Sequence, residues 1–126
     1  METMLIIDDE KPILNMFSLL LNLYGYRVFT AENGEDGLDV FKKEKPDVVF
    51  LDVKMPGMDG LTVLKEIKAV APETEVIIVT GHGDEDLAQS AFALNADDFI
   101  NKPFQKESLD EALDKWQKRL KDKESS

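Results

Sequence analysis

The fold is decided by the run Val48-Val49-Phe50-Leu51, which is followed at once by Asp52. An uninterrupted run of Val, Phe and Leu is typical of a short strand that is covered on both faces of a sheet. Two other runs have the same character, Met4–Ile7 and Val76–Val79. We therefore expect three central parallel strands.

Two shorter segments predict edge strands, because Tyr26–Ala31 alternates with polar residues and Phe99–Ile100 is flanked by them. Apolar residues recur at helical spacing between the strands, in Ile13–Tyr24, Glu35–Lys43, Leu61–Val70, Leu87–Leu94 and Leu109–Leu120. Five strands that alternate with five helices predict an α/β fold with right-handed crossovers and helices on both faces. We expect a flavodoxin-like (βα)5 doubly wound parallel sheet with the strand order 2-1-3-4-5.

The length of 126 residues corresponds to a single domain. We expect residues 1–126 to form that domain, with a core over about 4–120 and a frayed tail at 121–126. The chain has no cysteine and one histidine, His82, which excludes thiolate and histidine-rich metal sites. Any metal would have to bind oxygen ligands.

The net charge of −11 disfavours direct binding of nucleic acid and of anionic membrane surfaces. No apolar run approaches the ~20 residues that cross a bilayer, and the N-terminus does not have the pattern of a secretory signal. These features predict a cytoplasmic protein without a membrane partner.

Polar residues follow four of the predicted strands, at the edge of the sheet where parallel folds of this kind bind ligands. The residues that directly follow these strands are Asp8, Asp9 and Glu10; Asp52; Thr80, Gly81 and His82; and Lys102 and Pro103. Each has an ordinary structural alternative: Asp8 or Asp9 could cap the next helix, Asp52 could be a turn residue, Thr80 a strand end and Lys102 a solvated charge. Capping explains only one acid, so their convergence favours a functional site.

Clustered carboxylates repel one another unless a cation lies among them, and Mg²⁺ prefers such oxygen ligands. Mg²⁺ held by a few carboxylates is typical of phosphoryl chemistry, in which a lysine and a hydroxyl can bind the remaining phosphoryl oxygens. Asp52 is the best candidate for a nucleophile, because it ends the predicted middle strand between the acid pair and Thr80.

The chain resembles the receiver domain of two-component response regulators from Met4 to about Leu120. The resemblance depends on four stretches in this order and spacing: Ile6-Ile7-Asp8-Asp9-Glu10, residues 51–60 (Leu51-Asp52-Val53-Lys54-Met55-Pro56-Gly57-Met58-Asp59-Gly60), Val79-Thr80-Gly81, and Phe99-Ile100-Asn101-Lys102-Pro103-Phe104. Residues 80–84 and 98–104 are most similar to receivers of the nitrogen-regulation type and of some hybrid kinases.

The resemblance implies a role for each matching residue. Asp52 would accept a phosphoryl group from a histidine of a sensor kinase or phosphotransfer protein. Asp9 would bind Mg²⁺ (or Mn²⁺) directly and Asp8 largely through water, with the Asp52 carboxylate and the Lys54 carbonyl as further ligands. Thr80 would bond the phosphoryl group, Lys102 would pair with it, and Phe99 would be the rotating aromatic of the switch. The Lys102-Pro103 bond would be cis.

The resemblance also implies an output surface made by the fourth helix, fifth strand and fifth helix, which would meet a downstream effector. Lys54 and His82 lie two residues beyond Asp52 and Thr80, where we expect them to modulate hydrolysis of the acyl phosphate; a plain surface position is the alternative for His82. The only catalysis expected is the protein's own phosphorylation and dephosphorylation.

The segment Ile13–Tyr24 has more apolar surface than one sheet face requires. One stripe, Ile13, Phe17, Leu20, Leu21 and Tyr24, can cover the sheet, and Met16, Leu19 and Leu23 form a second stripe beside it. Together they span roughly 220° of the helix. The second stripe could be covered by a neighbouring helix of the domain, or it could dock the phosphodonor.

Three rival functions are weaker. A flavin carrier would need a phosphate-binding loop after the first strand, where Asp8-Asp9-Glu10 would repel phosphate. A haloacid-dehalogenase phosphatase needs a second acid two residues after its nucleophile, and that position is Lys54. A receiver that serves only as a scaffold would be expected to lack part of the set formed by Asp9, Asp52, Thr80 and Lys102.

Overall fold

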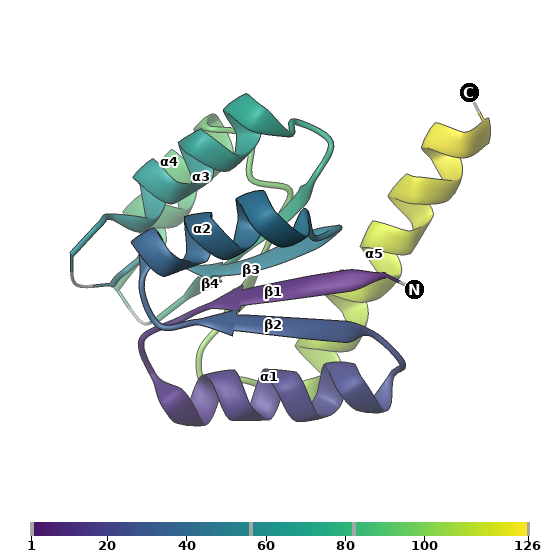
Figure 1. Ribbon diagram of the computed structural model, residues 1–126, viewed down its shortest axis with the longest axis horizontal. Helices are drawn as coiled ribbons and strands as arrows, with labels where there is room; N and C mark the ends of the chain where they lie inside the picture. The colour runs from purple at the N-terminus through teal and green to yellow at the C-terminus, as the bar shows by residue number, and fades with distance from the viewer. Residues whose placement is uncertain (1, 56, 82, 126) are drawn as a thin grey trace.

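The computed structural model describes residues 2–55, 57–81 and 83–125, and side chains up to residue 123. Strands and helices alternate along the chain (Figure 1): β1 (Thr3–Ile7), α1 (Lys11–Leu23), β2 (Arg27–Ala31), α2 (Gly34–Glu44), β3 (Val48–Asp52), α3 (Gly60–Val70), β4 (Glu75–Thr80), α4 (Glu85–Ala93), β5 (Asp98–Asn101) and α5 (Lys106–Ser125). The strands are all parallel in the order β2-β1-β3-β4-β5, which confirms the predicted topology.

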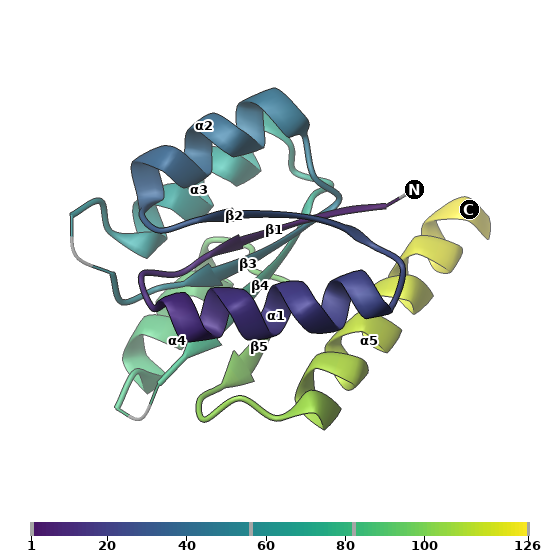
Figure 2. The same cartoon turned by 60° about the horizontal axis from the view of Figure 1, so that its bottom comes forward.

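The helices cover the sheet on both faces, with α1 and α5 on one side and α2, α3 and α4 on the other (Figures 1 and 2). Successive strand side chains alternate between two hydrophobic clusters, so that Leu5 and Ile7 pack toward α2 and α3 while Met4 and Ile6 pack toward α1 and α5. Every residue of β3 and β4 is buried. These strands are apolar throughout because helices cover both faces of the sheet, as the sequence predicts.

Gly37 lies inside α2, where glycine is unfavourable in a helix. A Cβ at this position would lie 2.5 Å from Cδ1 of Ile7. The glycine thus lets α2 approach β1 closely, a packing requirement that the helix sequence alone does not reveal.

The helix α5 continues through Ser125, beyond the predicted end at Leu120, and the fraying of residues 121–126 stays a prediction. One expectation about the face of α1 is wrong. In α1 the buried residues are Leu14, Phe17 and Leu21, whereas Tyr24 is half exposed and its hydroxyl donates to Asp110 on α5. Leu14 takes the place of Tyr24 on the core face, because it shares one helical face with Phe17 and Leu21, whereas Tyr24 is the C-cap beyond the end of the helix.

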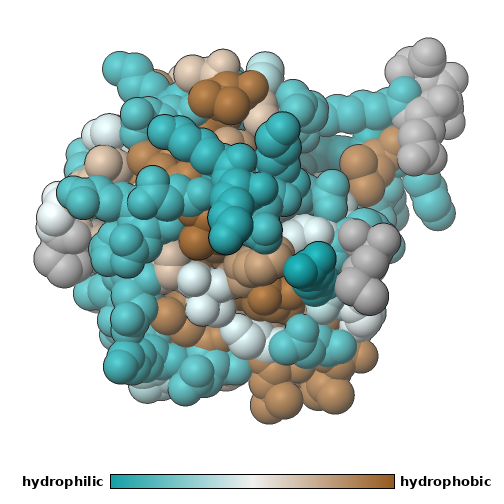
Figure 3. All heavy atoms as spheres, in the orientation of Figure 1, coloured by the Kyte–Doolittle hydropathy of each residue, from teal (hydrophilic) through white to brown (hydrophobic). Residues whose placement is uncertain are grey.

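The second stripe of α1 is exposed. Met16, Leu19 and Leu23 have exposed fractions of 36%, 62% and 71%. No helix in the described part of the chain covers them, so the alternative of a neighbouring helix as their cover is wrong for these residues. Figure 3 shows the resulting hydrophobic patch at the lower edge of the molecule, over α1.

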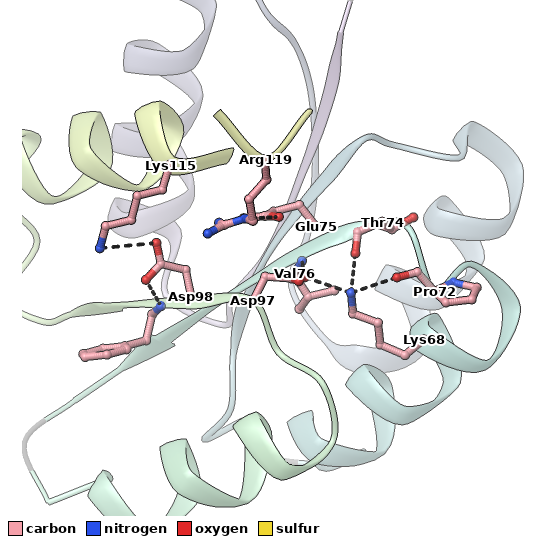
Figure 4. A network of polar contacts seen from close by, with 10 residues as sticks. Lys68, Pro72, Thr74, Glu75, Val76, Asp97, Asp98, Lys115 and Arg119 are labelled. Carbon is pink, nitrogen blue, oxygen red and sulfur yellow. Dashed lines mark hydrogen bonds and ion pairs between the residues drawn. The ribbon is translucent and has the colours of Figure 1, made fainter. Parts of the chain in front are cut away.

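At the amino ends of β4 and β5, ion pairs join the sheet to α3 and α5 (Figure 4). Nζ of Lys68 donates to Asp97 at 2.8 Å and to the Thr74 carbonyl at 2.6 Å. Arg119 pairs with the buried carboxylate of Glu75, and Lys115 lies 4.0 Å from Asp98. These contacts stabilise the amino ends of the strands, on the side of the sheet opposite to the predicted site. Among the described residues, no helix is both long and apolar enough to cross a bilayer.

Candidate functional site

The predicted site residues converge at the carboxyl ends of the strands. Asp8 directly follows β1, Asp52 ends β3 and Thr80 ends β4, and these three strands are neighbours in the sheet. Lys102 follows β5, whose residue Asn101 is paired with Thr80. Its bond to Pro103 is cis, as the resemblance implied.

The acidic cluster consists of Asp8, Asp9 and Asp52, each with a carboxylate oxygen within 4.8 Å of the others. Asp8 and Asp52 are 1% and 4% exposed, whereas Asp9 is exposed. Oδ1 of Asp8 accepts the N–H of Glu10 at 2.8 Å, and Oδ1 of Asp52 accepts the N–H of Lys54 at 2.9 Å. The bond to Glu10 lies in the loop before α1, whose N-cap has no side-chain hydrogen bond. Capping of α1 therefore does not explain Asp8.

Lys102 supplies the positive charge of the cluster. Its Nζ lies 2.6 Å from Oε2 of Glu10, 3.3 Å from Oδ2 of Asp52 and 3.4 Å from Oδ2 of Asp8. One ammonium thus holds three carboxylates. The sequence places Glu10 beside Asp8 and Asp9 but does not predict this contact with Lys102, because only the fold brings residues so far apart in the chain together.

The protonation of the cluster is shifted by burial. Desolvation raises the pKa of Asp8 from 3.8 to about 6, and the charge of Asp52 adds to this effect, while the N–H of Glu10 and the ammonium of Lys102 oppose it. Burial also raises the pKa of Asp52, and the Lys54 N–H and Lys102 offset part of the increase. Burial alone would lower the pKa of Lys102, but the hydrogen bond to Glu10 and the charges of Asp52 and Asp8 raise it. Lys102 therefore stays charged.

The cluster fits a hard divalent cation. Oδ2 of Asp8 is buried and accepts no hydrogen bond among the described residues; its one near partner is the Lys102 ammonium at 3.4 Å, so this oxygen can still bind an ion. The single charge of Lys102 does not remove the repulsion among the carboxylates of the acidic cluster. Mg²⁺ prefers carboxylate and water oxygens as ligands.

Thr80 is buried, and its hydroxyl donates to Oδ1 of Asn101 at 2.9 Å rather than to Asp52. Beside it lies a cavity of about 240 Å³ that Thr80, Ala88, Phe92 and Phe99 help to line. Phe99 is 45% exposed, and its ring packs edge-on against Phe92 at 5.8 Å. The role of Asn101 as acceptor was missed, since its residue type gives no signal of it.

The loops beyond Asp52 and Thr80 contain the predicted modulating residues. The Lys54 side chain is 73% exposed, and its Nζ faces Oδ1 of Asp84 at 3.8 Å. His82 lies outside the described residues, as does Pro56. Met55 is buried in the core, which fits a loop folded over the end of β3. Asp84 was not among the predicted site residues.

The raised pKa of Asp8 predicts a pH-dependent stability without divalent cations. The folded state holds the proton of Asp8 up to about pH 6, whereas the unfolded chain releases it near 3.8. The stabilisation from the neutral acid is therefore complete at low pH and is lost as the pH rises through 6. Between pH 5 and 7, the free energy of unfolding should fall by roughly 1 kcal/mol more in wild type than in Asp8→Asn.

Urea denaturation with EDTA measures this difference. Asp39→Asn, on the exposed face of α2, is the matched control and should follow wild type. An Asp8→Asn variant with the pH dependence of wild type would contradict the shifted pKa.

Comparison with known proteins gives consistent matches. A sequence profile described as "Response regulator receiver domain" matches residues 4–114. Sporulation initiation phosphotransferase F of Bacillus subtilis is 39% identical over 115 residues, which cover 91% of this chain and 93% of that protein. The DNA-binding transcriptional regulator NtrC of Klebsiella pneumoniae is 42% identical over 108 residues, or 86% of this chain but only 22% of the relative.

Comparison with solved structures agrees with the sequence matches. A receiver domain protein of Clostridium thermocellum superposes with a TM-score of 0.89 at 38% identity, covering 96% of this chain and 98% of that one. NtrX of Brucella abortus superposes with a TM-score of 0.92 at 34% identity, covering 99% of this chain and 29% of that one. This chain thus spans under a third of the length of NtrC and NtrX.

Proteins of the matched family are phosphorylation-dependent signalling switches rather than classical enzymes. They bind Mg²⁺ and interact with histidine kinases and effector domains. The profile match over most of the chain, the identity with its relatives and the shared fold agree with the motifs around Asp52. The chain belongs to the receiver domains of two-component response regulators.

Proposed function

We propose that Asp52 is the phosphoacceptor of this receiver and takes its phosphoryl group from a phosphohistidine of a sensor kinase or phosphotransfer protein. The observation that carries the proposal is the position of its buried carboxylate, within 4.8 Å of Asp8 and Asp9 and 3.3 Å from Nζ of Lys102. A carboxylate oxygen attacks phosphorus as the P–N bond breaks, and the imidazole leaves with the electron pair of that bond. The catalysis of the chain is limited to this transfer and to hydrolysis of its product.

Asp8, Asp9, Asp52 and the Lys54 carbonyl would hold Mg²⁺ or Mn²⁺. The ion supplies neutralisation of the charge on the phosphoryl oxygens. Lys102 already neutralises part of the cluster and stays charged, so it is available to bind a phosphoryl oxygen once Asp52 is modified. Two features support this ligand set: Oδ2 of Asp8 accepts no hydrogen bond among the described residues, and the acids repel one another.

The switch begins with Thr80 and reaches Phe99. Phosphorylation replaces the single negative charge of the Asp52 carboxylate with close to two on the phosphoryl group, and the Thr80 hydroxyl exchanges its bond to Asn101 for one to the phosphoryl group. The cavity beside Thr80 gives Phe99 space to turn inward. Rotation of this half-exposed ring changes the surface made by α4, β5 and α5, where the downstream effector would bind. Residues 4–120 form the core of this one receiver domain.

The side chain of Lys54 modulates hydrolysis of the acyl phosphate, since it extends from the loop that carries the Asp52 contact. His82 is proposed for the same role from its place in the sequence alone.

The exposed stripe of α1 is the docking site that we propose for the phosphodonor. Met16, Leu19 and Leu23 form an apolar surface on a helix that begins two residues after Asp9, next to the acidic cluster. A donor helix bundle that covers this stripe would bring its histidine close to Asp52. Large exposed apolar patches on a soluble domain mark interaction sites.

The first test is incubation with acetyl phosphate and Mg²⁺, followed by intact-mass measurement. One phosphoryl group should add to wild type and to Asp39→Asn, and none to Asp52→Ala. EDTA should abolish labelling of wild type. Undiminished labelling of Asp52→Ala would refute the assignment of the phosphoacceptor.

The second test separates docking from chemistry. Met16→Lys and Leu19→Lys should each slow phosphotransfer from the cognate kinase by about tenfold, because a lysine ammonium cannot be buried in an apolar interface without cost. Acetyl phosphate labelling should be unchanged. Val70→Lys, at a residue of α3 that is 65% exposed, is the control. Kinase phosphotransfer at the wild-type rate in both α1 variants would contradict docking here.

A further inference from the structure

A cavity of about 490 Å³ lies at the amino ends of the strands, on the side of the sheet opposite to the acidic cluster. It is bounded by the loop between α2 and β3, the loop between α3 and β4, and the last turns of α5. These turns of α5 extend past the ends of the strands (Figure 1). The volume lies within the range of roughly 300–1,000 Å³ that is typical of sites for small molecules.

The floor of the cavity is apolar and belongs to the hydrophobic core. Phe41 and Trp116 line it and are each 3% exposed. Pro46 is buried in the loop before β3, while Ala71 and Leu120 are half-buried on the side of α3 and on α5. Apolar side chains thus face the cavity from several elements, so that the apolar body of a ligand would lose much of its contact with water.

The rim of the cavity carries more positive than negative charge, although the whole chain has a net charge of −11. The charged residues that line it are Lys42, Lys45, Lys123, Asp47 and Glu73. Oδ2 of Asp47 accepts the N–H of Thr3 at 2.8 Å, so this acid already has a partner. The excess of lysines favours a ligand with a negative head group.

The position of Lys45 is the more informative of the two on α2. Lys42 lies in the last turn of the helix, where a lysine also complements the helix dipole. Lys45 is the C-cap and has φ 49° and ψ 61°, in the left-handed region where glycine or asparagine is usual. The turn itself therefore does not favour lysine at this position. Its charge at the rim of the cavity is a reason for it.

We propose that this cavity binds a small organic anion with an apolar body, such as an aromatic or aliphatic carboxylate. The body would lie against Phe41, Trp116 and Leu120, and the acidic head against the ammonium groups of Lys42 and Lys45. Among the described residues, neither of these two ammonium groups has a hydrogen-bond or ionic partner, so both can pair with the head group. The site is separate from the acidic cluster and does not depend on the proposed role of Asp52.

The test is an NMR titration that follows Trp116, because it is the one tryptophan of the chain and lines the cavity. Naphthoate is the probe, and naphthamide, which has nearly the same shape and no charge, is its control. Naphthoate should shift the indole N–H signal of Trp116. Its Kd should be about tenfold lower than that of naphthamide, since only the carboxylate makes charge-assisted hydrogen bonds with the lysines.

Three variants separate the head group from the body. Lys42→Gln combined with Lys45→Gln should weaken naphthoate binding about tenfold and leave the affinity for naphthamide unchanged. Leu120→Asn removes apolar surface from the wall of the cavity and should weaken both ligands. Lys65→Gln, on the exposed face of α3 and outside the cavity, is the matched control and should bind both ligands as wild type does.

Two results would overturn the proposal. The first is an indole signal of Trp116 that neither naphthoate nor octanoate shifts, including the case in which only the amide signals of Met16, Leu19 and Leu23 move, because the anion would then bind the exposed stripe of α1. The second is equal affinity for naphthoate and naphthamide in wild type, since the lysines would then not select an anion.

Discussion

The burial of two neighbouring carboxylates, Asp8 and Asp52, governs the chemistry of the whole site. The sheet forces it, because both residues lie at the ends of adjacent central strands whose apolar residues must stay buried. Lys102 neutralises the cluster only in part, and the pKa of both acids remains raised. A site in this condition gains by binding a cation, and under the proposed function the bound cation would make the addition of a phosphoryl group at Asp52 electrostatically feasible.

The same electrostatics explain how phosphorylation in the acidic cluster could change the conformation of residues outside it. Thr80 is bonded to Asn101, and the Gly81 N–H to Asp84, so in the unphosphorylated protein the groups that could bind a phosphoryl oxygen are occupied elsewhere. Each of these bonds contributes on the order of 1 kcal/mol, and stronger anionic acceptors can replace them. Beside Thr80 and Phe99 lies a cavity rather than packed core, which under the proposed function would give the Phe99 ring space to turn. In contrast, the ion pairs at the opposite edge, such as Lys68 with Asp97, fasten the sheet to its helices.

Most of the fold could be predicted from the sequence, because uninterrupted apolar runs such as Val48–Leu51 fit only strands that are buried on both faces. The convergence of Asp8, Asp52, Thr80 and Lys102 followed from that topology. Glu10, Asn101 and Asp84 were missed because their roles depend on which side chains meet across the sheet. The close approach of Gly37 to Ile7 was missed for the same reason. Helix ends were less predictable, as α5 shows: its last turns are polar and depend on local helix propensity rather than on core packing.

Burial raises the pKa of both Asp8 and Asp52, and a cation bound between them should lower it again. Carboxyl carbon NMR of Asp8 as a function of pH, with and without Mg²⁺, measures this directly. We expect a pKa of about 6 for Asp8 without the ion and a clearly lower pKa with it. A pKa that stays near 3.8 under both conditions would show that burial does not shift the ionisation of Asp8, and the cluster would then have no such reason to bind a cation.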